Sequence, residues 1–215
     1  MSRLLLLMTL AARLLPAHDV FSTKLTWTRD ISRIVVQRCL SCHQTGGKAF
    51  SLETFEAARP WAKAIKEEVI NRRMPPWGAV KGFGEFRNDP SLTQDEIGLI
   101  SNWVEGGSPE GEKVFLPDMK APEFTVPPAV KGHPLQVTGS LVLKQAGSIV
   151  ALEPTQLGAA TQVIAELPDG SVEPLVWILD PAQALHREYQ YDGAVDLPKG
   201  TRIVAPQGSW RVVFR

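Results

Sequence analysis

The sequence predicts an α+β multidomain chain in which a small all-α domain is followed by a small antiparallel β-sandwich domain. Three observations lead to this prediction. Apolar residues recur at helical spacing in residues 21–111, prolines crowd residues 112–134, and short strand-like runs fill residues 135–215. The chain is therefore expected to change from helices to strands across a proline-rich linker.

Charge and composition narrow the class of protein. The 215 residues contain 23 Lys and Arg against 23 Asp and Glu, and 44% of them are apolar. A balanced charge excludes the strongly basic class of nucleic-acid-binding proteins, and the apolar content is that of a folded globular protein. We expect no nucleic-acid partner, so function has to be inferred from local motifs.

Residues 1–17 have the order of a secretory signal peptide. Arg3 precedes the apolar run 4–12, and Ala17 offers a small residue at the cleavage position. The run is too short to span a bilayer, and no membrane span is expected beyond this segment. The sequence predicts export to the periplasm, with the signal either removed or kept as an uncleaved membrane tether; an amphipathic first helix is the remaining alternative.

Three to four helices are expected in residues 21–111. The apolar spacing predicts one helix over 28–39 and a second region over 51–73, which Pro60 divides because proline fits only the first turn of a helix. A third helix is expected over 93–107, where a Thr-Gln-Asp-Glu capping box begins it and two glycines end it. These helices are expected to form a compact core.

Strands are expected after the linker 112–134. Alternating or continuous apolar runs recur through residues 135–215, and Pro168-Asp169-Gly170-Ser171 is a turn signal between two of them. Short strands of this kind predict a small β-sandwich.

The chemistry of the chain is concentrated in Cys39-Leu40-Ser41-Cys42-His43, which contains both of its cysteines. Two thiols at this spacing can add to the two vinyl groups of a haem, and the following histidine then lies where it can bind the iron. A thioredoxin-like redox pair is a rival, but such a pair follows a strand, whereas this one ends a predicted helix. A zinc site is a second rival, but the chain has no further cysteine pair. The motif therefore predicts covalently attached haem c, with Cys39, Cys42 and His43 as cofactor-binding residues.

The second axial ligand is expected to be Met74. It precedes Pro75 and Pro76, which forbid a helix and present the sulfur from a stiff extended segment. A thioether favours ferrous iron and raises the reduction potential. The alternative is a core methionine, and Met119, in the linker, is a poorer candidate ligand.

Other residues near this motif have two interpretations each. Trp61, Trp77 and Trp103 either pack against the porphyrin edge or belong to the protein core. Arg72 and Arg73 either neutralise a haem propionate or lie on the surface as ordinary charges.

Several segments resemble a known family. They lie within residues 27–111 and look like the cytochrome c module of bacterial exported proteins. The matching segments are Arg29-Asp30-Ile31, Cys39 to His43, Phe50 to Phe55, Ala58 to Ala62, Arg73 to Trp77 and Trp103 to Gly111. The resemblance implies a small all-α cytochrome c domain with one haem and with His43 and Met74 as axial ligands of the iron.

A weaker resemblance extends into the β region. Residues 167–178 and 189–202 are similar to the last part of the copper type II, ascorbate-dependent monooxygenases of the peptidylglycine-hydroxylating kind, to which that module is often fused. Where that family has a His-x-His copper pair, this chain has Thr155-Gln156-Leu157-Gly158, and its histidines His133 and His186 are isolated. We therefore expect no copper site and a degenerate domain that is either a relic or a docking platform.

Two functions are compatible with these residues. The first is a periplasmic electron carrier that exchanges single electrons with redox partner proteins of the cell envelope and has no catalytic residue. The second is the haem subunit of an oxidative enzyme, or an oxygenase or sensor, in which Met74 is displaced by a small ligand.

Overall fold

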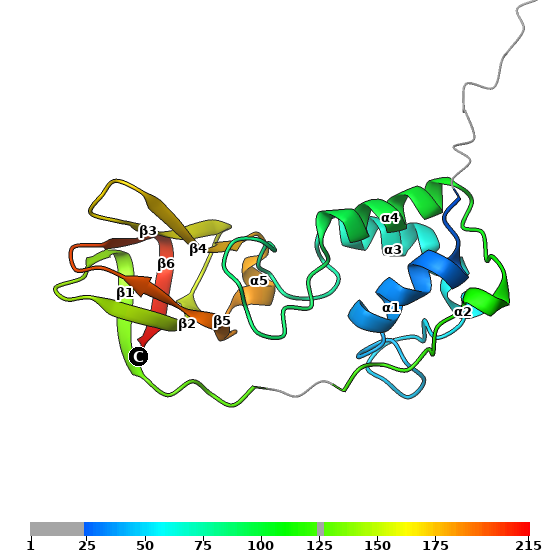
Figure 1. Cartoon of the computed structure of the whole chain (residues 1–215), viewed down its shortest axis with the longest axis horizontal. Coiled ribbons are helices and arrows are strands. Elements are labelled where there is room, and N and C mark those ends of the chain that lie inside the picture. The colour runs from blue at the N-terminus through cyan, green and yellow to red at the C-terminus, as the bar shows by residue number, and fades with distance from the viewer. Residues whose placement is uncertain (1–23, 124–126) are drawn as a thin grey trace, which may run out of the picture.

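The helices of the computed structural model are short, and all but η3 and α5 lie in the first half of the chain (Figure 1). The structure describes residues 24–123 and 127–215, so the predicted signal peptide 1–17 lies outside the described residues. The helical elements are η1 (Trp27–Ile31), α1 (Ser32–Arg38), α2 (Phe55–Ala58), η2 (Arg59–Trp61), α3 (Ala62–Ile70), α4 (Gln94–Glu105), η3 (Lys113–Phe115) and, between two strands, α5 (Pro181–Ala184).

Local sequence signals determine where several helices begin and end. Helix α4 begins with the predicted capping box, in which the Thr93 hydroxyl accepts a hydrogen bond from the backbone N–H of Glu96 and the Glu96 carboxylate accepts one from the backbone N–H of Thr93. It ends at Gly106, as predicted. Pro60 lies in the first turn of η2, between α2 and α3, as its missing N–H requires. The helix that leads into Cys39 is also confirmed, as α1.

The second half of the chain forms an antiparallel sheet. Its strands are β1 (His133–Val142), β2 (Gly147–Gln156), β3 (Thr161–Glu166), β4 (Val172–Ile178), β5 (Tyr189–Leu197) and β6 (Arg202–Phe214). The spatial order is β4-β3-β6-β2-β5, and β1 also pairs with β6. The predicted turn at Pro168 to Ser171 joins β3 to β4, with the Asp169 carboxylate accepting a hydrogen bond from the backbone N–H of Ser171.

The predicted β-sandwich is wrong, because the strands form one curled sheet that resembles half of a barrel. The long strand β6 pairs with β3 at residues 202–204 and with β2 at residues 209–214, so both pairs belong to the same sheet. The strand bends between these parts, where Gly208 has φ +75° and the register with β1 shifts between Thr138 and Gly139, so that the extra residues, 206–208, lie on β6. Inward and outward side chains alternate in a curled sheet as they do in a sandwich, so the sequence pattern does not distinguish the two.

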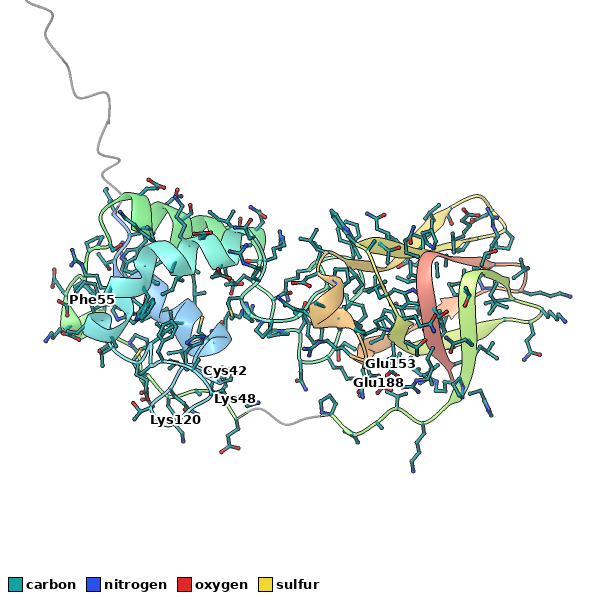
Figure 2. The ribbon with its side chains drawn as sticks, turned by 180° about the vertical axis from the view of Figure 1, so that it is seen from behind. Cys42, Lys48, Phe55, Lys120, Glu153 and Glu188 are labelled. Carbon is teal, nitrogen blue, oxygen red and sulfur yellow. The ribbon has the colours of Figure 1, made fainter. Side chains whose placement is uncertain are left out.

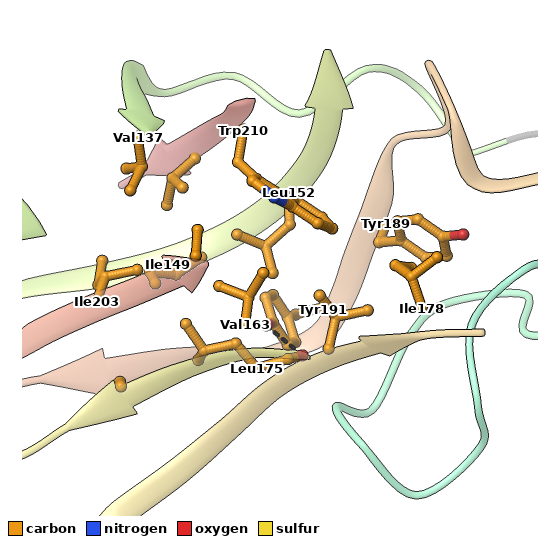
Figure 3. Close-up of a cluster of buried hydrophobic side chains, with 14 of the residues drawn as sticks. Val137, Ile149, Leu152, Val163, Leu175, Ile178, Tyr189, Tyr191, Ile203 and Trp210 are labelled. Atoms are coloured by element: carbon orange, nitrogen blue, oxygen red, sulfur yellow. Dashed lines mark hydrogen bonds between the residues drawn. The ribbon is translucent and has the colours of Figure 1, made fainter. Parts of the chain in front are cut away.

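The concave side of this sheet holds a hydrophobic core (Figure 3). Leu152, Val163, Leu175, Ile203 and Trp210, from four different strands, are fully buried in it. Burying such side chains stabilises the fold by about 1.5–3 kcal/mol each before entropy is counted. The sheet half therefore has a core of its own.

The predicted small all-α cytochrome c domain is also wrong. The helices are short, and residues 39–54 and 71–93 between them are almost entirely irregular. The buried apolar residues of the helices form a second cluster around Trp27 and Trp103, but the segment from Trp77 to Phe86 belongs to the core of the sheet. Helical periodicity identified the separate helices, and it contains no information about where the connecting loops pack.

An ionic contact anchors the end of the linker to the sheet. Arg211 on β6 pairs with Glu153 on β2 and with Glu188, whose carboxylates are labelled in Figure 2. Glu188 also accepts hydrogen bonds from the backbone N–H of Val130 and from Gln190. Burial alone would raise the pKa of Glu188, but these hydrogen bonds and those from Arg211 hold it below its ordinary value.

Candidate functional site

The two cysteines lie on one tight turn that follows α1; Cys42 is labelled in Figure 2. The backbone N–H groups of Cys42 and His43 both donate to the carbonyl of Cys39, at 3.1 and 2.9 Å, so the motif folds back on itself. Leu40 is fully buried in the helical cluster and anchors the turn. Both thiols are free, and burial, followed by the nearby Glu96 carboxylate, raises the pKa of Cys39 to about 12. The turn thus brings two unpaired thiols and one imidazole together, with the Cys39 thiol packed against the helical cluster.

The imidazole of His43 is oriented by a backbone carbonyl. Its Nδ1 lies 2.9 Å from the carbonyl oxygen of Phe50. A carbonyl can only accept, so Nδ1 carries a proton, and in the neutral imidazole Nε2 is then the nitrogen with the lone pair. This is the usual second contact of a metal-binding histidine, which fixes both the tautomer and the ring orientation.

The loop between Cys42 and Glu53 is held by its own hydrogen bonds. The Glu53 carboxylate accepts bonds from the side chain and backbone of Thr45 and from Ser51, and these bonds lower the pKa of Glu53. At Gly47 a Cβ would lie 2.6 Å from the carbonyl oxygen of Cys42, so only glycine fits there. The loop therefore has a defined shape around His43.

Aromatic rings extend from His43 to the surface. The Phe50 ring lies edge-on to His43 at 4.8 Å and stacks on Trp61 at 4.5 Å. Phe50 is 44% exposed and Trp61 46% exposed, so the stacked pair forms an exposed aromatic surface. An open aromatic surface next to the thiols suits a flat apolar ligand.

Met74 lies beyond the end of α3. Its backbone N–H donates to the carbonyl of Glu68 at 3.3 Å, and its side chain is 41% exposed. Within the described residues, no hydrogen bond or ring contact joins Met74 to His43. The structure therefore brings Cys39, Cys42 and His43 together, and it presents Met74 as an accessible thioether on a separate segment.

The three tryptophans considered from the sequence have different environments. Trp61 is exposed beside Phe50, whereas Trp103 is buried and donates its indole N–H to the carbonyl of Pro109 at 3.0 Å. Trp77 is buried in the core of the sheet, where its ring lies 4.9 Å from that of Tyr189. Of the three, Trp61 is the one whose ring stacks on Phe50, the neighbour of His43.

The two arginines before Met74 already have protein partners. Arg73 makes an ion pair with Glu68 at 2.7 Å, and Arg72 donates to the side-chain oxygen of Gln94 at 3.0 Å. Each guanidinium also keeps free donor positions, so these contacts do not decide between a surface role and a propionate contact.

Three side chains that the sequence did not single out hold residues 73–77, which include Met74. Gln183, Arg187 and Tyr189, in or next to α5 and β5, donate hydrogen bonds to the carbonyls of residues 73, 76 and 77. They lie more than a hundred residues away in sequence. The only local signal is the Pro75-Pro76 pair, which has carbonyls to satisfy and no N–H to donate.

The turn fits a covalently attached haem by the chemistry of its donors. It provides two unpaired thiols, a histidine with Nε2 free, and exposed aromatic rings. The described residues contain no group of three or more His, Cys, Asp and Glu side chains able to hold a metal ion. Haem iron takes at most two ligands from the protein, so a haem site needs no such group.

Thr155, near the end of β2, has a structural role. The Thr155 hydroxyl donates to the carbonyl of Ser209 at 3.0 Å and accepts from Gln136. His133 begins β1, and His186 lies at φ +60° in the connection after α5.

Comparison with known proteins finds no relative. No protein-family model matches the chain, no curated protein matches its sequence, and no solved structure matches its fold.

Proposed function

We propose that this chain is a monohaem electron-transfer protein with covalently bound haem c and no catalytic residue. The haem, once attached, supplies one-electron chemistry by changing between ferrous and ferric iron. Cys39 and Cys42 hold it through thioether bonds, His43 binds the iron through Nε2, and Met74 is the second axial ligand. The protein does this without the all-α domain that the sequence led us to expect.

The observation that carries this proposal is the state of His43. Its Nδ1 is committed to the carbonyl of Phe50 at 2.9 Å, on the same turn as two free thiols. A disulfide exchanger would not need an imidazole oriented in this way, and a zinc site would need further ligands. Fixing the tautomer with Nε2 unprotonated prepares the ring for an iron ligand bond.

The remaining parts of the proposal concern location and partners. Export to the periplasm rests on residues 1–17, which lie outside the described residues. Over residues 24–123 and 127–215, no helix combines the length and apolar character needed to cross a membrane. Electrons would pass to and from other proteins of the cell envelope, with part of the sheet surface as a docking platform, and no copper is involved.

A second function is favoured by one observation, the 41% exposure of Met74. A thioether so accessible could be displaced, and the site would then admit a small ligand as in an oxidative enzyme or a sensor. Carbon monoxide distinguishes the two functions: an electron carrier with Met74 bound takes it up slowly, whereas an open site binds it at once.

The proposal is tested by replacing both thiols. In cells with the c-type maturation machinery, the Cys39→Ala/Cys42→Ala variant should show no haem stain on a denaturing gel. The Ser41→Ala variant is the matched control, because it changes the same turn and keeps both thiols. Haem staining retained in the double variant would disprove covalent attachment at this motif.

A further inference from the structure

The segment after Met74 has more backbone hydrogen-bond acceptors than donors. Pro75 and Pro76 have no N–H, so the segment cannot join a ladder of backbone hydrogen bonds. Three carbonyls of residues 73–77 nevertheless have partners, because those of Arg73, Pro76 and Trp77 each accept a bond from a distant side chain. The donors are Gln183 Nε2 at 3.2 Å, Arg187 Nη2 at 3.3 Å and Tyr189 Oη at 2.7 Å.

The side chain that ends this segment is fixed as well. The Trp77 ring is 7% exposed, the Arg187 guanidinium lies 5.1 Å over it, and the Tyr189 ring packs edge-on at 4.9 Å. Arg187 and Tyr189 therefore each contact the segment twice, once through a carbonyl and once through the indole.

The next residues are joined to the sheet through the backbone. The carbonyl of Gly78 accepts hydrogen bonds from the N–H groups of Leu179 and Asp180, at 2.9 and 3.2 Å, and Val80 donates to the carbonyl of Trp177 at 2.8 Å. A Cβ at Gly78 would lie 2.9 Å from that of Ala184 in α5, so the loop approaches α5 closely. In Figure 1 this loop lies beside α5.

Met74 is thus held on both sides by different halves of the molecule. On one side its N–H is bonded to the carbonyl of Glu68 in α3, and on the other its chain is attached to the sheet from Pro76 onward. The Met74 residue itself is 41% exposed.

We infer that Gln183, Arg187 and Tyr189 are positioning residues that keep Met74 on the iron. This inference rests on the proposed function. The sheet half then determines how readily a competing ligand displaces the thioether, because releasing Met74 requires the segment to detach from these three donors. The role is one of retention, and none of the three side chains binds the iron.

The test compares two tyrosines in the full-length haem protein. Tyr189→Phe removes the donor to Trp77, and Tyr191→Phe is the matched control, because its hydroxyl is likewise buried and donates to a backbone carbonyl, that of Leu175 at 2.8 Å. Losing one partner of a buried hydrogen bond shifts such an equilibrium by about tenfold. Carbon monoxide should therefore bind the ferrous Tyr189→Phe protein about tenfold faster than wild type, with the Tyr191→Phe protein unchanged.

Three further measurements make the outcome decisive. The methionine-sulfur charge-transfer band of the ferric protein should weaken in Tyr189→Phe, and backbone amide exchange at residues 77–80 should quicken, whereas Tyr191→Phe changes neither. Arg187→Gln should also speed carbon monoxide binding. Arg187→Lys, which keeps a positively charged donor, should bind carbon monoxide at a rate between those of Arg187→Gln and wild type.

The possible failures are distinguishable. Wild-type protein without covalent haem overturns the proposed function and this role together. Haem-bearing protein in which the two tyrosine variants bind carbon monoxide at equal rates overturns this inference alone.

Discussion

The Tyr189 hydroxyl donates a 2.7 Å hydrogen bond to the carbonyl oxygen of Trp77, across 112 residues of sequence. The bond joins the start of β5 to the segment that follows Met74, and both residues are buried. It is the shortest of the three hydrogen bonds that side chains near α5 make to this segment. Through this bond the sheet is attached to the segment that carries Met74, the proposed iron ligand.

Removing the indole of Trp77 should destabilise the sheet half. Trp77→Ala leaves a cavity between Phe86 and Tyr189, and such changes cost about 3–5 kcal/mol of unfolding free energy. Urea denaturation followed by circular dichroism measures it. The matched control is Trp61→Ala, which alters an exposed ring and should cost roughly 1 kcal/mol or less. Equal losses in the two variants would show that Trp77 is not in the core.

The bend in β6 should tolerate only glycine at position 208. Gly208 has φ +75°, and a Cβ there would collide with the carbonyl oxygen of Gln156. Gly208→Ala should lower the unfolding free energy by about 2 kcal/mol or more, because the cost of the strained backbone adds to the cost of the steric clash. Gly158→Ala, where nothing lies within 4 Å, should leave stability within about 1 kcal/mol of wild type. Thermal denaturation of both variants checks this, and an unaffected Gly208→Ala protein would argue against the bend.

The Arg211 contacts should make stability sensitive to acid. The pKa of Glu188 is lower in the folded protein than in the unfolded chain. Its contribution to the free energy of unfolding is therefore fully present above its unfolded pKa, about 4.3, and is lost as pH falls through its folded pKa. The melting temperature should therefore fall below about pH 4.

Glu188→Gln should flatten this acid dependence and lower stability at neutral pH, since it leaves Arg211 with only Glu153. Glu123→Gln, which changes an exposed carboxylate of the linker, is a suitable control. A wild-type melting curve that is identical at pH 3 and pH 7 would contradict the assigned role of Glu188.

Met74→Ala should change the haem and leave the fold intact. Loss of the thioether lowers the midpoint potential, because ferrous iron loses its soft ligand, and opens the site to carbon monoxide. Met119→Ala is the control, since Met119 packs against the helical cluster and should affect stability without altering the spectrum. If the spectrum changes in Met119→Ala and not in Met74→Ala, the axial ligand has been assigned to the wrong methionine.

Local signals in the sequence were sufficient for several elements of the fold. The Thr93 capping box, the division at Pro60 and the turn at Asp169 each depend on residues a few positions apart, and all three occur in the structure. The turn that groups Cys39, Cys42 and His43 is local in the same sense.

The rest depends on contacts that no short pattern encodes. The curled sheet forms because β6 pairs with β2 and β3 together, and alternation alone is the same in a sandwich. No local pattern shows which of the two cores contains Trp77. Its ring contact with Tyr189, far away in sequence, places it in the core of the sheet. The orientation of His43 likewise follows from a carbonyl seven residues away, that of Phe50.

The most direct test is the intact mass of the wild-type protein purified from cells competent in c-type haem attachment. The account predicts a mass greater than that of the polypeptide by one haem, with the added mass recovered on the peptide that contains Cys39 and Cys42. A protein with the bare polypeptide mass would contradict the central claim.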